Sequence, residues 1–344
     1  MHLKKYQVTT LVVFTILTIT IIGVIVVGMV VGAMVRADQS SYRFSLSGNP
    51  PTPTPFQPRS FADAVAAGLA EHMPQPVFTP TPVPTIPVSQ LPTNQMNILL
   101  LGVDDFGDNN FRTDVIILLS VNPKHNSVSM VSFPRDLYVS IPGYWSNRIN
   151  TAWGLGGWSL LQDTFEVNFG IRPEYYMMVN YDGFKYVINS IGGIDIEVTQ
   201  ELQDECSMDP SGWCTLQPGM THMDSNLALW YARSRKTTSD FDRNRRAQEV
   251  VQAIFHKGMS LNSLSKAPEL YRAYREYVDT NLKFSELVPL APMAPALLNN
   301  DNVHRYAVTP DMAYDFITAE GAMVLMPNIP AIQSMLSEAL YRNE

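Results

Sequence analysis

The longest run of apolar positions in the chain lies at its N-terminus. From Val8 to Val35 there is no charged residue, and the run exceeds the roughly 20 apolar residues that a helix needs to cross a bilayer. Lysines precede it, so the positive-inside rule predicts a cytoplasmic tail over residues 1–7 and export of everything after the run. A cleaved signal peptide is the alternative, but its apolar region spans only about 7–15 residues. The pattern favours a single uncleaved transmembrane helix over residues 8–35.

A segment rich in proline and threonine follows, over residues 36–95. Stretches such as GNPPTPTPFQP and VFTPTPVPTIPVSQLP favour polyproline II, a stiff conformation that advances about 3 Å per residue. Between them, RSFADAVAAGLAEHM at 59–73 has the pattern of a short helix, which is more typical of a transient linker helix than of a packed one. We interpret 36–95 as an extracytoplasmic linker that holds a folded domain, 96–344, away from the membrane.

Three apolar runs of strand length open the folded domain. NILLLGV at 97–103 suits a strand buried on both faces, and VIILLSV (115–121) is separated from SVSMVSF (127–133) by NPKHN, a short polar segment typical of hairpins. If the second and third runs pair antiparallel, the start of one lies beside the end of the other. If the first runs parallel to the third, its end reaches the same place.

Charged residues flank these three runs at that shared end of the predicted sheet. Asp104 follows the first run, Arg112 and Asp114 precede the second, and Arg135 and Asp136 follow the third. Ligands of open α/β sheets bind outside the carboxyl ends of strands, carboxylates with phosphates hold Mg²⁺, and arginine is the bidentate partner of phosphate oxygens. The pattern predicts a Mg²⁺-pyrophosphate site, whereas for any single residue a surface ion pair is the alternative.

A basic segment, YARSRKTTSDFDRNRR at 231–246, stands out in a chain whose formal net charge is −8. NLALWYA, which leads into it, has a helical pattern. If YARSR is extended, Arg233 and Arg235 share one face because side chains alternate along a strand. Local positive charge in an acidic protein indicates a local anionic ligand, and the overall acidity argues against a nucleic-acid surface, which needs a broad basic face.

The end of this basic segment predicts a second helix. Ser239 or Asp240 is expected to cap a helix that reaches about Lys257. One stripe along that helix contains Arg243, Ala247, Val250, Val251 and Ile254. Arg243 is therefore expected to face inward, where an anion would satisfy it, while Arg245 is expected to face solvent.

Composition narrows the chemistry further. With 344 residues, 46% of them hydrophobic, the chain can bury a sizeable core. It contains no HExxH zinc motif, no GK[ST] phosphate loop and no evident Ser/His/Asp or Cys/His nucleophile system. Its two cysteines, Cys206 and Cys214, are closely spaced in a segment predicted to be exported, which favours a loop-closing disulfide.

Five segments together resemble the LytR-CpsA-Psr (LCP) proteins of bacterial cell envelopes. In order and spacing they are GVDD with RTD, SFPRD, RINTAWGLGG, YYMMVNYDGFKYVINSIGGIDI and YARSRKTTSDFDRNRR. The likeness covers roughly residues 95–258, so we divide the domain into a core, 96–260, and a C-terminal extension, 261–344. The resemblance implies an α/β fold, a three-layer α-β-α sandwich around a central mixed sheet, with an apolar cleft for a polyprenyl chain.

The resemblance also implies an activity. LCP proteins are membrane-anchored, extracytoplasmic phosphotransferases that move a glycopolymer from an undecaprenyl-pyrophosphate carrier to a peptidoglycan sugar hydroxyl through a phosphodiester bond, with Mg²⁺ or Mn²⁺. By motif position, Asp104 and Asp114 would be the metal ligands. The pyrophosphate would be held by Arg112, Arg135, Arg233, Arg235 and Arg243. Of these, Arg112, Arg135 and Arg243 would be catalytic together with Asp240, which would order the arginine-rich segment or lie near the acceptor hydroxyl.

One departure from the family pattern and two other functions stay open. Family members often carry glutamine directly after the last arginine of DFxRxxRQ, but here Ala247 stands there and the glutamine is Gln248. One residue turns a side chain by about 100° on a helix, so the family role does not carry over to it. The chain is alternatively a sensor that binds polyprenyl phosphates without transfer, or a lipid-pyrophosphate phosphatase.

Overall fold

The computed structural model describes residues 95–104, 112–259 and 267–341. The predicted tail, membrane helix and 59–73 helix, and all of the linker before residue 95, lie outside the described residues. Within the described ranges, no helix is both long enough and apolar enough to cross a membrane.

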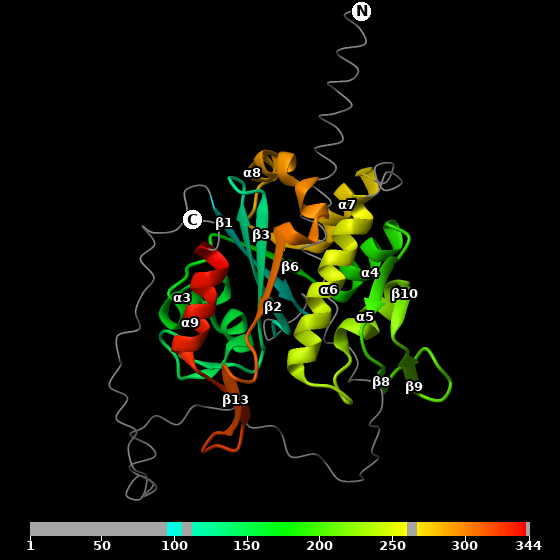
Figure 1. The fold of residues 1–344 in the computed structure, drawn as a ribbon. Coiled ribbons are helices and arrows are strands. Elements are labelled where there is room, and N and C mark those ends of the chain that lie inside the picture. Colours follow the sequence, from blue (N-terminus) through cyan, green and yellow to red (C-terminus); the bar gives the residue numbers. More distant parts are fainter. Residues whose placement is uncertain (1–94, 105–111, 260–266, 342–344) are drawn as a thin grey trace, which may run out of the picture. The chain divides into compact units, whose positions relative to one another are not determined.

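A mixed sheet of six strands forms the centre of the described part (Figure 1). Its order is β11-β6-β1-β2-β3-β12, and the strands are β1 (Met96–Gly102), β2 (Val115–Asn122), β3 (Ser127–Phe133), β6 (Tyr175–Val179), β11 (Val278–Thr280) and β12 (Val303–Ala307). β1 pairs antiparallel with β2, and β2 with β3, so β1 and β3 run in the same direction with β2 between them. β6 is parallel to β1, and β12 is parallel to β3. The three predicted strands and their directions are confirmed.

Helices and short two-stranded ribbons complete the described fold. The α-helices are α3 (Ala152–Phe169), α4 (Tyr181–Ser190), α5 (Ser225–Arg233), α6 (Asp240–Gly258), α7 (Ala267–Tyr277), α8 (Phe284–Leu287) and α9 (Ile329–Tyr341). The 3-10 turns are η2 (Ile149–Thr151), η4 (Val288–Met293), η5 (Ala296–Leu298) and η6 (Asn300–Asn302). The ribbons pair β4 (Tyr138–Val139) with β5 (Asn147–Arg148), β7 (Ile194–Val198) with β10 (Gly219–Met223), β8 (Leu202–Glu205) with β9 (Trp213–Leu216), and β13 (Ala313–Ile317) with β14 (Met323–Pro327).

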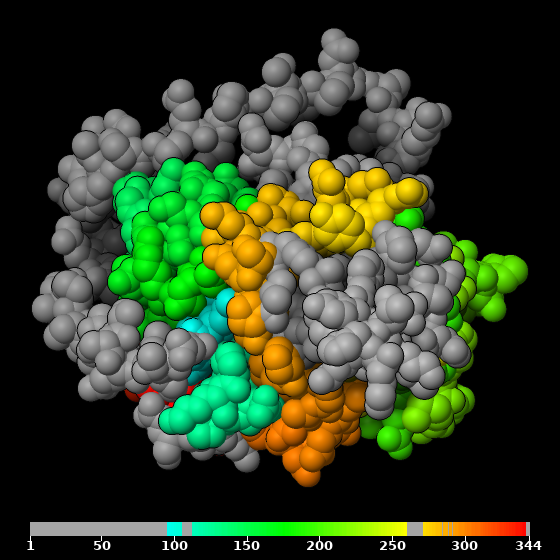
Figure 2. All heavy atoms as spheres, turned by 90° about the horizontal axis from the view of Figure 1, so that it is seen from above, coloured from blue at the N-terminus to red at the C-terminus, as the bar shows by residue number. Residues whose placement is uncertain are grey.

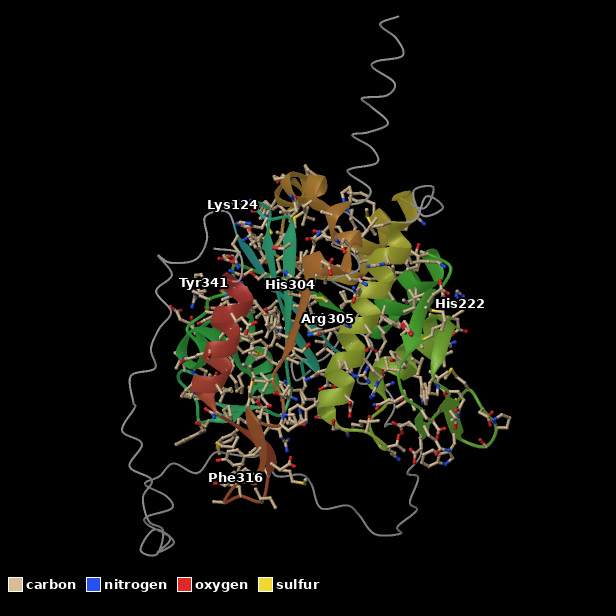
Figure 3. The ribbon with its side chains drawn as sticks, viewed as in Figure 1. Lys124, His222, His304, Arg305, Phe316 and Tyr341 are labelled. Carbon is tan, nitrogen blue, oxygen red and sulfur yellow. A yellow bond between two sulfur atoms is a disulfide. The ribbon has the colours of Figure 1, made fainter. Side chains whose placement is uncertain are left out.

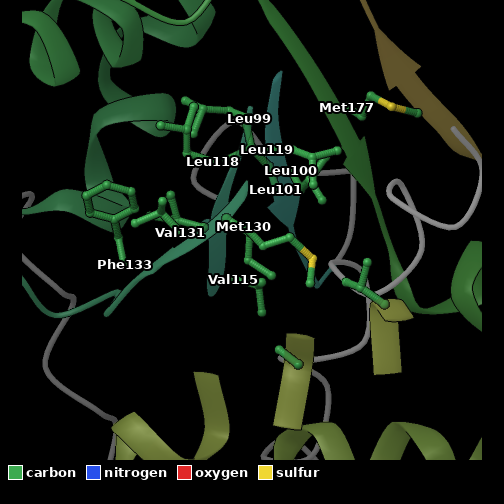
Figure 4. Close-up of a cluster of buried hydrophobic side chains, with 14 of the residues drawn as sticks. Leu99, Leu100, Leu101, Val115, Leu118, Leu119, Met130, Val131, Phe133 and Met177 are labelled. Carbon is green, nitrogen blue, oxygen red and sulfur yellow. The ribbon is translucent and has the colours of Figure 1, made fainter. Parts of the chain in front are cut away.

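The sheet is covered by helices on both faces, which explains why its central strands are apolar at consecutive positions. Two neighbouring residues of β3 show this, because successive side chains of a strand point to opposite faces. Ser132 accepts a hydrogen bond from the side chain of Gln248 on α6, while Phe133 packs against Phe165 and Phe169 of α3 with ring centroids 5.1 Å away in each case. Figure 4 shows Phe133 among the buried side chains of β1, β2 and β3. The three layers expected from the sequence are present.

The segment after residue 267 belongs to this same sheet. It supplies both edge strands, β11 beside β6 and β12 beside β3, and α9 packs on α3 and β3. In Figure 2 the orange residues of this segment lie next to the teal turn between β2 and β3. Without these strands both flanks of the sheet would expose unpaired backbone groups. The C-terminal extension therefore completes the core and does not form a separate body.

The disulfide predicted between the two cysteines is confirmed. Cys206 and Cys214 are bonded, with Cα atoms 5.6 Å apart. The bridge lies at the turn end of the β8–β9 ribbon, where Asp204 of β8 is paired in register with Cys214. Consequently the turn between these strands is a closed covalent loop.

Candidate functional site

Backbone hydrogen bonds join several chain segments at one end of the sheet, which we call the charged end. The Asp114 amide donates to the Gly102 carbonyl over 2.7 Å, which joins the start of β2 to the end of β1. The Thr113 amide donates to Asn150, and the Asn150 amide donates to the Arg135 carbonyl, over 3.3 and 3.2 Å. In this way the structure brings the predicted aspartate and arginine segments together.

The side chains at the charged end form a chain of ion pairs. Arg135 reaches Asp114 through Nη1 at 3.0 Å and Asp136 through Nε at 3.4 Å. Arg148 then reaches the other oxygen of Asp136 at 3.2 Å and also donates to the Met323 carbonyl of β14. Arg135 thus bridges two carboxylates, and the β13–β14 hairpin lies beside it. Figure 3 labels Phe316 of this hairpin, and Lys124 marks the opposite end of the sheet.

Asp114 is the buried carboxylate of this end, with 2% of its surface exposed. Its Oδ1 binds Arg135, whereas its Oδ2 is buried with no hydrogen-bond partner among the described residues. Burial raises the pKa of Asp114, the positive charges of Arg135 and Arg243 oppose that rise, and the negative charge of Asp104 adds to it. The two predicted metal ligands are therefore electrostatic neighbours.

These two carboxylates fit a hard divalent cation. Mg²⁺ in phosphate sites is commonly held by one or two carboxylates, with water and phosphate oxygens completing its shell. Asp104 with Asp114 supplies two carboxylates, and the buried Oδ2 of Asp114 is an acceptor that a cation would satisfy. The described residues contain no group of three or more His, Cys, Asp or Glu side chains arranged for a metal, so a self-sufficient protein cage does not occur there.

Arg243 faces inward from α6, as the stripe predicted. Its exposed fraction is 2%, and Nη1 pairs with Asp240 at 3.3 Å, while Nε and Nη2 are buried without a hydrogen-bond partner among the described residues. Burial lowers the pKa of Arg243. Arg245 instead points outward to Glu249, 2.5 Å away. A capping box formed by Ser239 and Asp242 starts the helix, which also confirms the predicted cap.

Arg233 comes to the same place from α5, but not in the predicted conformation. The expectation of an extended YARSR is wrong, because residues up to Arg233 are helical: Asp224 caps the helix, and its apolar face is buried into the core. The Arg233 guanidinium lies 4.9 Å from the centroid of the Tyr181 ring, and its Nε is buried without a hydrogen-bond partner in the described part. Burial lowers the pKa of Arg233.

The three remaining predicted residues lie at the rim. Arg235 is exposed, yet its charge lowers the pKa of both Arg233 and Arg243, so it is within electrostatic range of the buried pair. Asp240 is partly exposed and pairs with Arg243. Arg112 is exposed, two residues before Asp114. The structure therefore gathers four arginines and three aspartates, and leaves Arg112 at the margin.

Arg246 was not predicted, although its role is clear in the structure. It is 1% exposed, and its guanidinium donates to the Tyr231 carbonyl over 2.9 Å, to the Ser234 carbonyl and to the Thr238 hydroxyl over 3.1 Å. Burial lowers its pKa to about 10, so it stays charged at neutral pH. Through these bonds Arg246 fixes the segment that joins α5 to α6. It lies four residues before Val250 on the apolar stripe, a spacing that marks it as inward-facing.

Gln248, whose role the sequence left open, and Asn150, whose amide donates to the Arg135 carbonyl, are both buried. The Gln248 amide donates to the Ser132 hydroxyl and the Tyr306 carbonyl, both over 2.7 Å, so it ties α6 to β3 and β12. Asn150 is buried inside η2 and does not act as a helix cap; its Oδ1 has no hydrogen-bond partner among the described residues.

The described residues form a mixed α/β sandwich with buried, incompletely paired arginines and carboxylates at its strand ends, an arrangement suited to an anionic ligand. The chain belongs to the LytR-CpsA-Psr family: the profile of the LytR_cpsA_psr family matches residues 68–339. That match extends past the segment 95–258 covered by the motifs, in agreement with the C-terminal strands that complete the sheet.

Among curated relatives, the chain is similar to two proteins named polyisoprenyl-teichoic acid–peptidoglycan teichoic acid transferase TagU. The one from Bacillus mycoides is 35% identical over 190 residues, which is 54% of this chain and 60% of the relative. The one from Oceanobacillus iheyensis is 34% identical over 213 residues, 60% of this chain and 64% of the relative. The match thus spans somewhat less than two thirds of each relative.

Solved structures show the same fold. B. subtilis TagV aligns with a TM-score of 0.61 and 26% identity over 72% of this chain and 97% of TagV. TagT bound to LIIa-WTA aligns with a TM-score of 0.58 and 27% identity over 72% of this chain and 92% of TagT. These likenesses agree with the mixed sheet and its helical layers.

Proposed function

We propose that this protein is a phosphotransferase that moves a glycopolymer from an undecaprenyl-pyrophosphate carrier to peptidoglycan through a phosphodiester bond. The family supports this proposal, as do the TagU relatives named as transferases of polyisoprenyl-linked teichoic acid to peptidoglycan. The single observation that carries it is the set of buried guanidinium nitrogens without partners on Arg233 and Arg243.

Those nitrogens indicate an anionic ligand for a physical reason. A buried donor left without an acceptor costs about 1–3 kcal/mol, more when it is charged, so folded proteins rarely keep one. Arg233 and Arg243 keep three such atoms, and both residues are within electrostatic range of Asp114 and Arg235. A pyrophosphate offers several strong acceptor oxygens and two or more negative charges, and it satisfies these donors together.

Each residue of the charged end then has a part in the reaction. Arg233 and Arg243 hold the pyrophosphate from the helical side, and Arg235 adds charge at the rim. Arg135 stands between the anion and Asp114. Burial alone would lower the pKa of Arg135, but the charges of Asp114 and Asp136 raise it, so the Arg135 side chain remains positively charged. Asp240 orders Arg243 through their ion pair. Arg112 is close enough in sequence to the metal-binding aspartate to approach the phosphates from outside.

A divalent cation, Mg²⁺ or Mn²⁺, is proposed at Asp104 and Asp114. When bound, it would neutralise charge on the phosphate oxygens and orient the pyrophosphate. In the transfer, the acceptor hydroxyl oxygen bonds to the phosphorus that carries the polymer, the bond to the lipid-side phosphate breaks, the lipid leaves as its monophosphate, and the hydroxyl proton passes to solvent. Positioning and charge neutralisation suffice for such a reaction, so the protein needs no covalent nucleophile.

We also propose that the domain acts outside the cytoplasmic membrane, anchored through residues 8–35. The uncharged apolar run and the preceding lysines support this location. The Cys206–Cys214 disulfide agrees with an oxidising compartment.

One incubation tests the proposed function. The full chain in detergent is given a lipid-pyrophosphate-linked glycan, Mg²⁺ and peptidoglycan, and the products are separated. We expect polymer attached to peptidoglycan and free lipid monophosphate. Phosphate and polymer released without attachment would make the protein a phosphatase, and lipid that is bound but intact would make it a sensor. An Arg243→Met variant is the control for activity that does not depend on the charged end.

A further inference from the structure

The segment between α5 and α6, residues 234–239, carries Arg235 and Lys236 on an exposed stretch of backbone. An exposed polar connection has few apolar contacts to hold it, so its conformation depends on hydrogen bonds from neighbouring elements. Arg246 supplies these from the α6 side through the Ser234 carbonyl and the Thr238 hydroxyl. A second set comes from the opposite side, from the β8–β9 ribbon.

Asp204 is the centre of this second set. Its side chain is only 5% exposed, and its Oδ2 accepts the backbone amides of Arg235 over 2.6 Å and of Lys236 over 3.0 Å. A carboxylate that accepts two backbone amides forms charge-assisted hydrogen bonds, which are stronger than neutral ones. Asp204 thereby fixes the backbone from which the Arg235 guanidinium extends.

Other contacts tie the same ribbon to the arginine-bearing elements. The Thr237 hydroxyl donates to the Gln203 carbonyl, Lys236 pairs with Glu205, and the Trp230 indole of α5 donates to the Glu205 carbonyl over 2.8 Å. In addition, the negative charge of Asp204 favours the charged form of Arg233. The ribbon therefore acts on both arginines without touching the proposed phosphate position itself.

The disulfide joins the two strands of the ribbon covalently. Among the described strands, β8 and β9 pair only with each other and do not join the central sheet, and an isolated two-stranded ribbon is at best marginally stable. Its outer side chains Met208 and Trp213 are 42% and 43% exposed, so no core closes over them. Asp204 lies directly opposite Cys214, whose bond to Cys206 locks the strands at that position.

We propose that Asp204 is a positioning residue for the pyrophosphate of the lipid donor, and that the disulfide-closed β8–β9 ribbon is the device that holds Asp204 against the arginine segment. This inference rests on the proposed function, because it gives the arginines the donor pyrophosphate as their ligand. Asp204 does not contact the donor; it fixes the backbone of Arg235 through the two amide hydrogen bonds.

The test compares Asp204→Ala and Asp204→Asn with a matched change on the same ribbon, Asp209→Ala. Asp209 accepts the Ser211 amide in the exposed turn, and its side chain has no hydrogen bond or ion pair with the described residues of the charged end. We measure KM for the lipid-pyrophosphate donor and kcat separately, together with the affinity for inorganic pyrophosphate in the presence of Mg²⁺ by calorimetry, on the full chain.

We expect Asp204→Ala to raise the donor KM and the pyrophosphate Kd at least about tenfold, which corresponds to ~1.4 kcal/mol, with a smaller change in kcat. Asp204→Asn keeps an acceptor oxygen and is expected to fall between the wild type and Ala. Replacing both Cys206 and Cys214 by serine is expected to raise KM in the same direction. Asp209→Ala is expected to behave as the wild type.

Several results would overturn the inference. One is an unchanged KM and Kd in Asp204→Asn or Asp204→Ala, and another is an equal effect of Asp209→Ala. If Asp204→Ala loses its cooperative unfolding transition, Asp204→Asn and the double serine variant still test the inference. A wild type that binds pyrophosphate but transfers no polymer removes the proposed function and leaves the positioning role testable through Kd. A wild type that does not bind pyrophosphate overturns both.

Discussion

Three arginines on α6 allow the charged end to be tested, because replacing them should change the free energy of unfolding in different directions. Arg243 is buried with two nitrogens that have no partner among the described residues, Arg246 is buried and donates through Nε and Nη2 to three acceptors, and Arg245 is partly exposed beside Glu249. Replacing each by methionine keeps most of the apolar stem and removes the guanidinium. The three variants should therefore separate the arginine that binds ligand from the one that holds the fold.

For Arg243→Met we expect little loss of stability in the free protein. Two unsatisfied buried donors disappear, each worth about 1–3 kcal/mol of relief, and the ion pair with Asp240 is lost. Asp240 is partly exposed and regains water, so losing the ion pair costs less than this relief of about 2–6 kcal/mol, and we expect the free energy of unfolding to stay the same or to rise. Pyrophosphate affinity should fall by about 3 kcal/mol, or roughly 100-fold in Kd, because two charge-assisted bonds are lost.

For Arg246→Met the expectation is the reverse. Three hydrogen bonds from a charged donor are lost, and the Tyr231 and Ser234 carbonyls are left without them. We expect a loss of about 3–5 kcal/mol in the free energy of unfolding. Arg245→Met should change stability by less than about 0.5 kcal/mol and leave pyrophosphate binding as it was, since exposed pairs contribute little.

Urea unfolding of each variant and calorimetric titration with Mg²⁺ and pyrophosphate give the two quantities. The reasoning is refuted if Arg243→Met destabilises the free protein as much as Arg246→Met, because its nitrogens would then be satisfied in the folded state. It is equally refuted if Arg245→Met weakens pyrophosphate binding as much as Arg243→Met does.

Three further predictions concern the metal, the displaced glutamine and pH. Asp104→Ala and Asp114→Ala should each abolish Mg²⁺-dependent transfer while circular dichroism shows a folded domain; full activity in either variant would remove the metal assignment. Gln248→Ala should cost about 1–3 kcal/mol in the free energy of unfolding, because it leaves buried acceptors unpaired, with the donor KM retained; a raised KM at unchanged stability would return this residue to the site. Burial lowers the pKa of His256 from its ordinary 6.5, so the unfolded chain binds the proton first and stability should fall as pH drops below that value. Unfolding measured at about pH 7.5 and about pH 5.5 should show this dependence reduced in His256→Phe, and an equal slope in both proteins would contradict it.

The pattern of apolar residues and the helix-capping residues predicted much of the fold. The apolar runs predicted β1, β2 and β3 with their directions, and the Ser239 cap predicted where α6 begins. Both signals are local, since each depends on side chains a few residues apart. The extended YARSR was wrong because the helical packing of α5 against the core, which depends on distant residues, extends to Arg233. Alternation of arginines in sequence therefore did not decide their conformation.

The sequence predicted most residues of the charged end, but it did not predict the residues that hold them in position. The predicted strand directions place Asp104, Asp114 and Arg135 at one end of the sheet. No sequence signal connects Asp204 to the arginine segment about thirty residues later, because that contact depends on how the β8–β9 ribbon docks onto the loop. Long-range hydrogen bonds between irregular segments have no periodic pattern, and so they appear only in the folded structure.

Arg243 and Arg246 lie on the same helix, and both are buried and face inward. They differ in how many hydrogen bonds the fold provides to their guanidinium groups. The chain provides two carbonyls and a hydroxyl for Arg246, and no nitrogen of Arg246 is among the buried unpartnered atoms of the described residues. Arg243, one turn earlier, meets one carboxylate and keeps two nitrogens without partners among the described residues. Departures from full polar satisfaction are expected where a protein binds a ligand and not where it only folds. Because both residues lie in the same helix, the difference between them supports the proposed position of the pyrophosphate at the N-terminal turn of α6, beside Arg135 and Asp114.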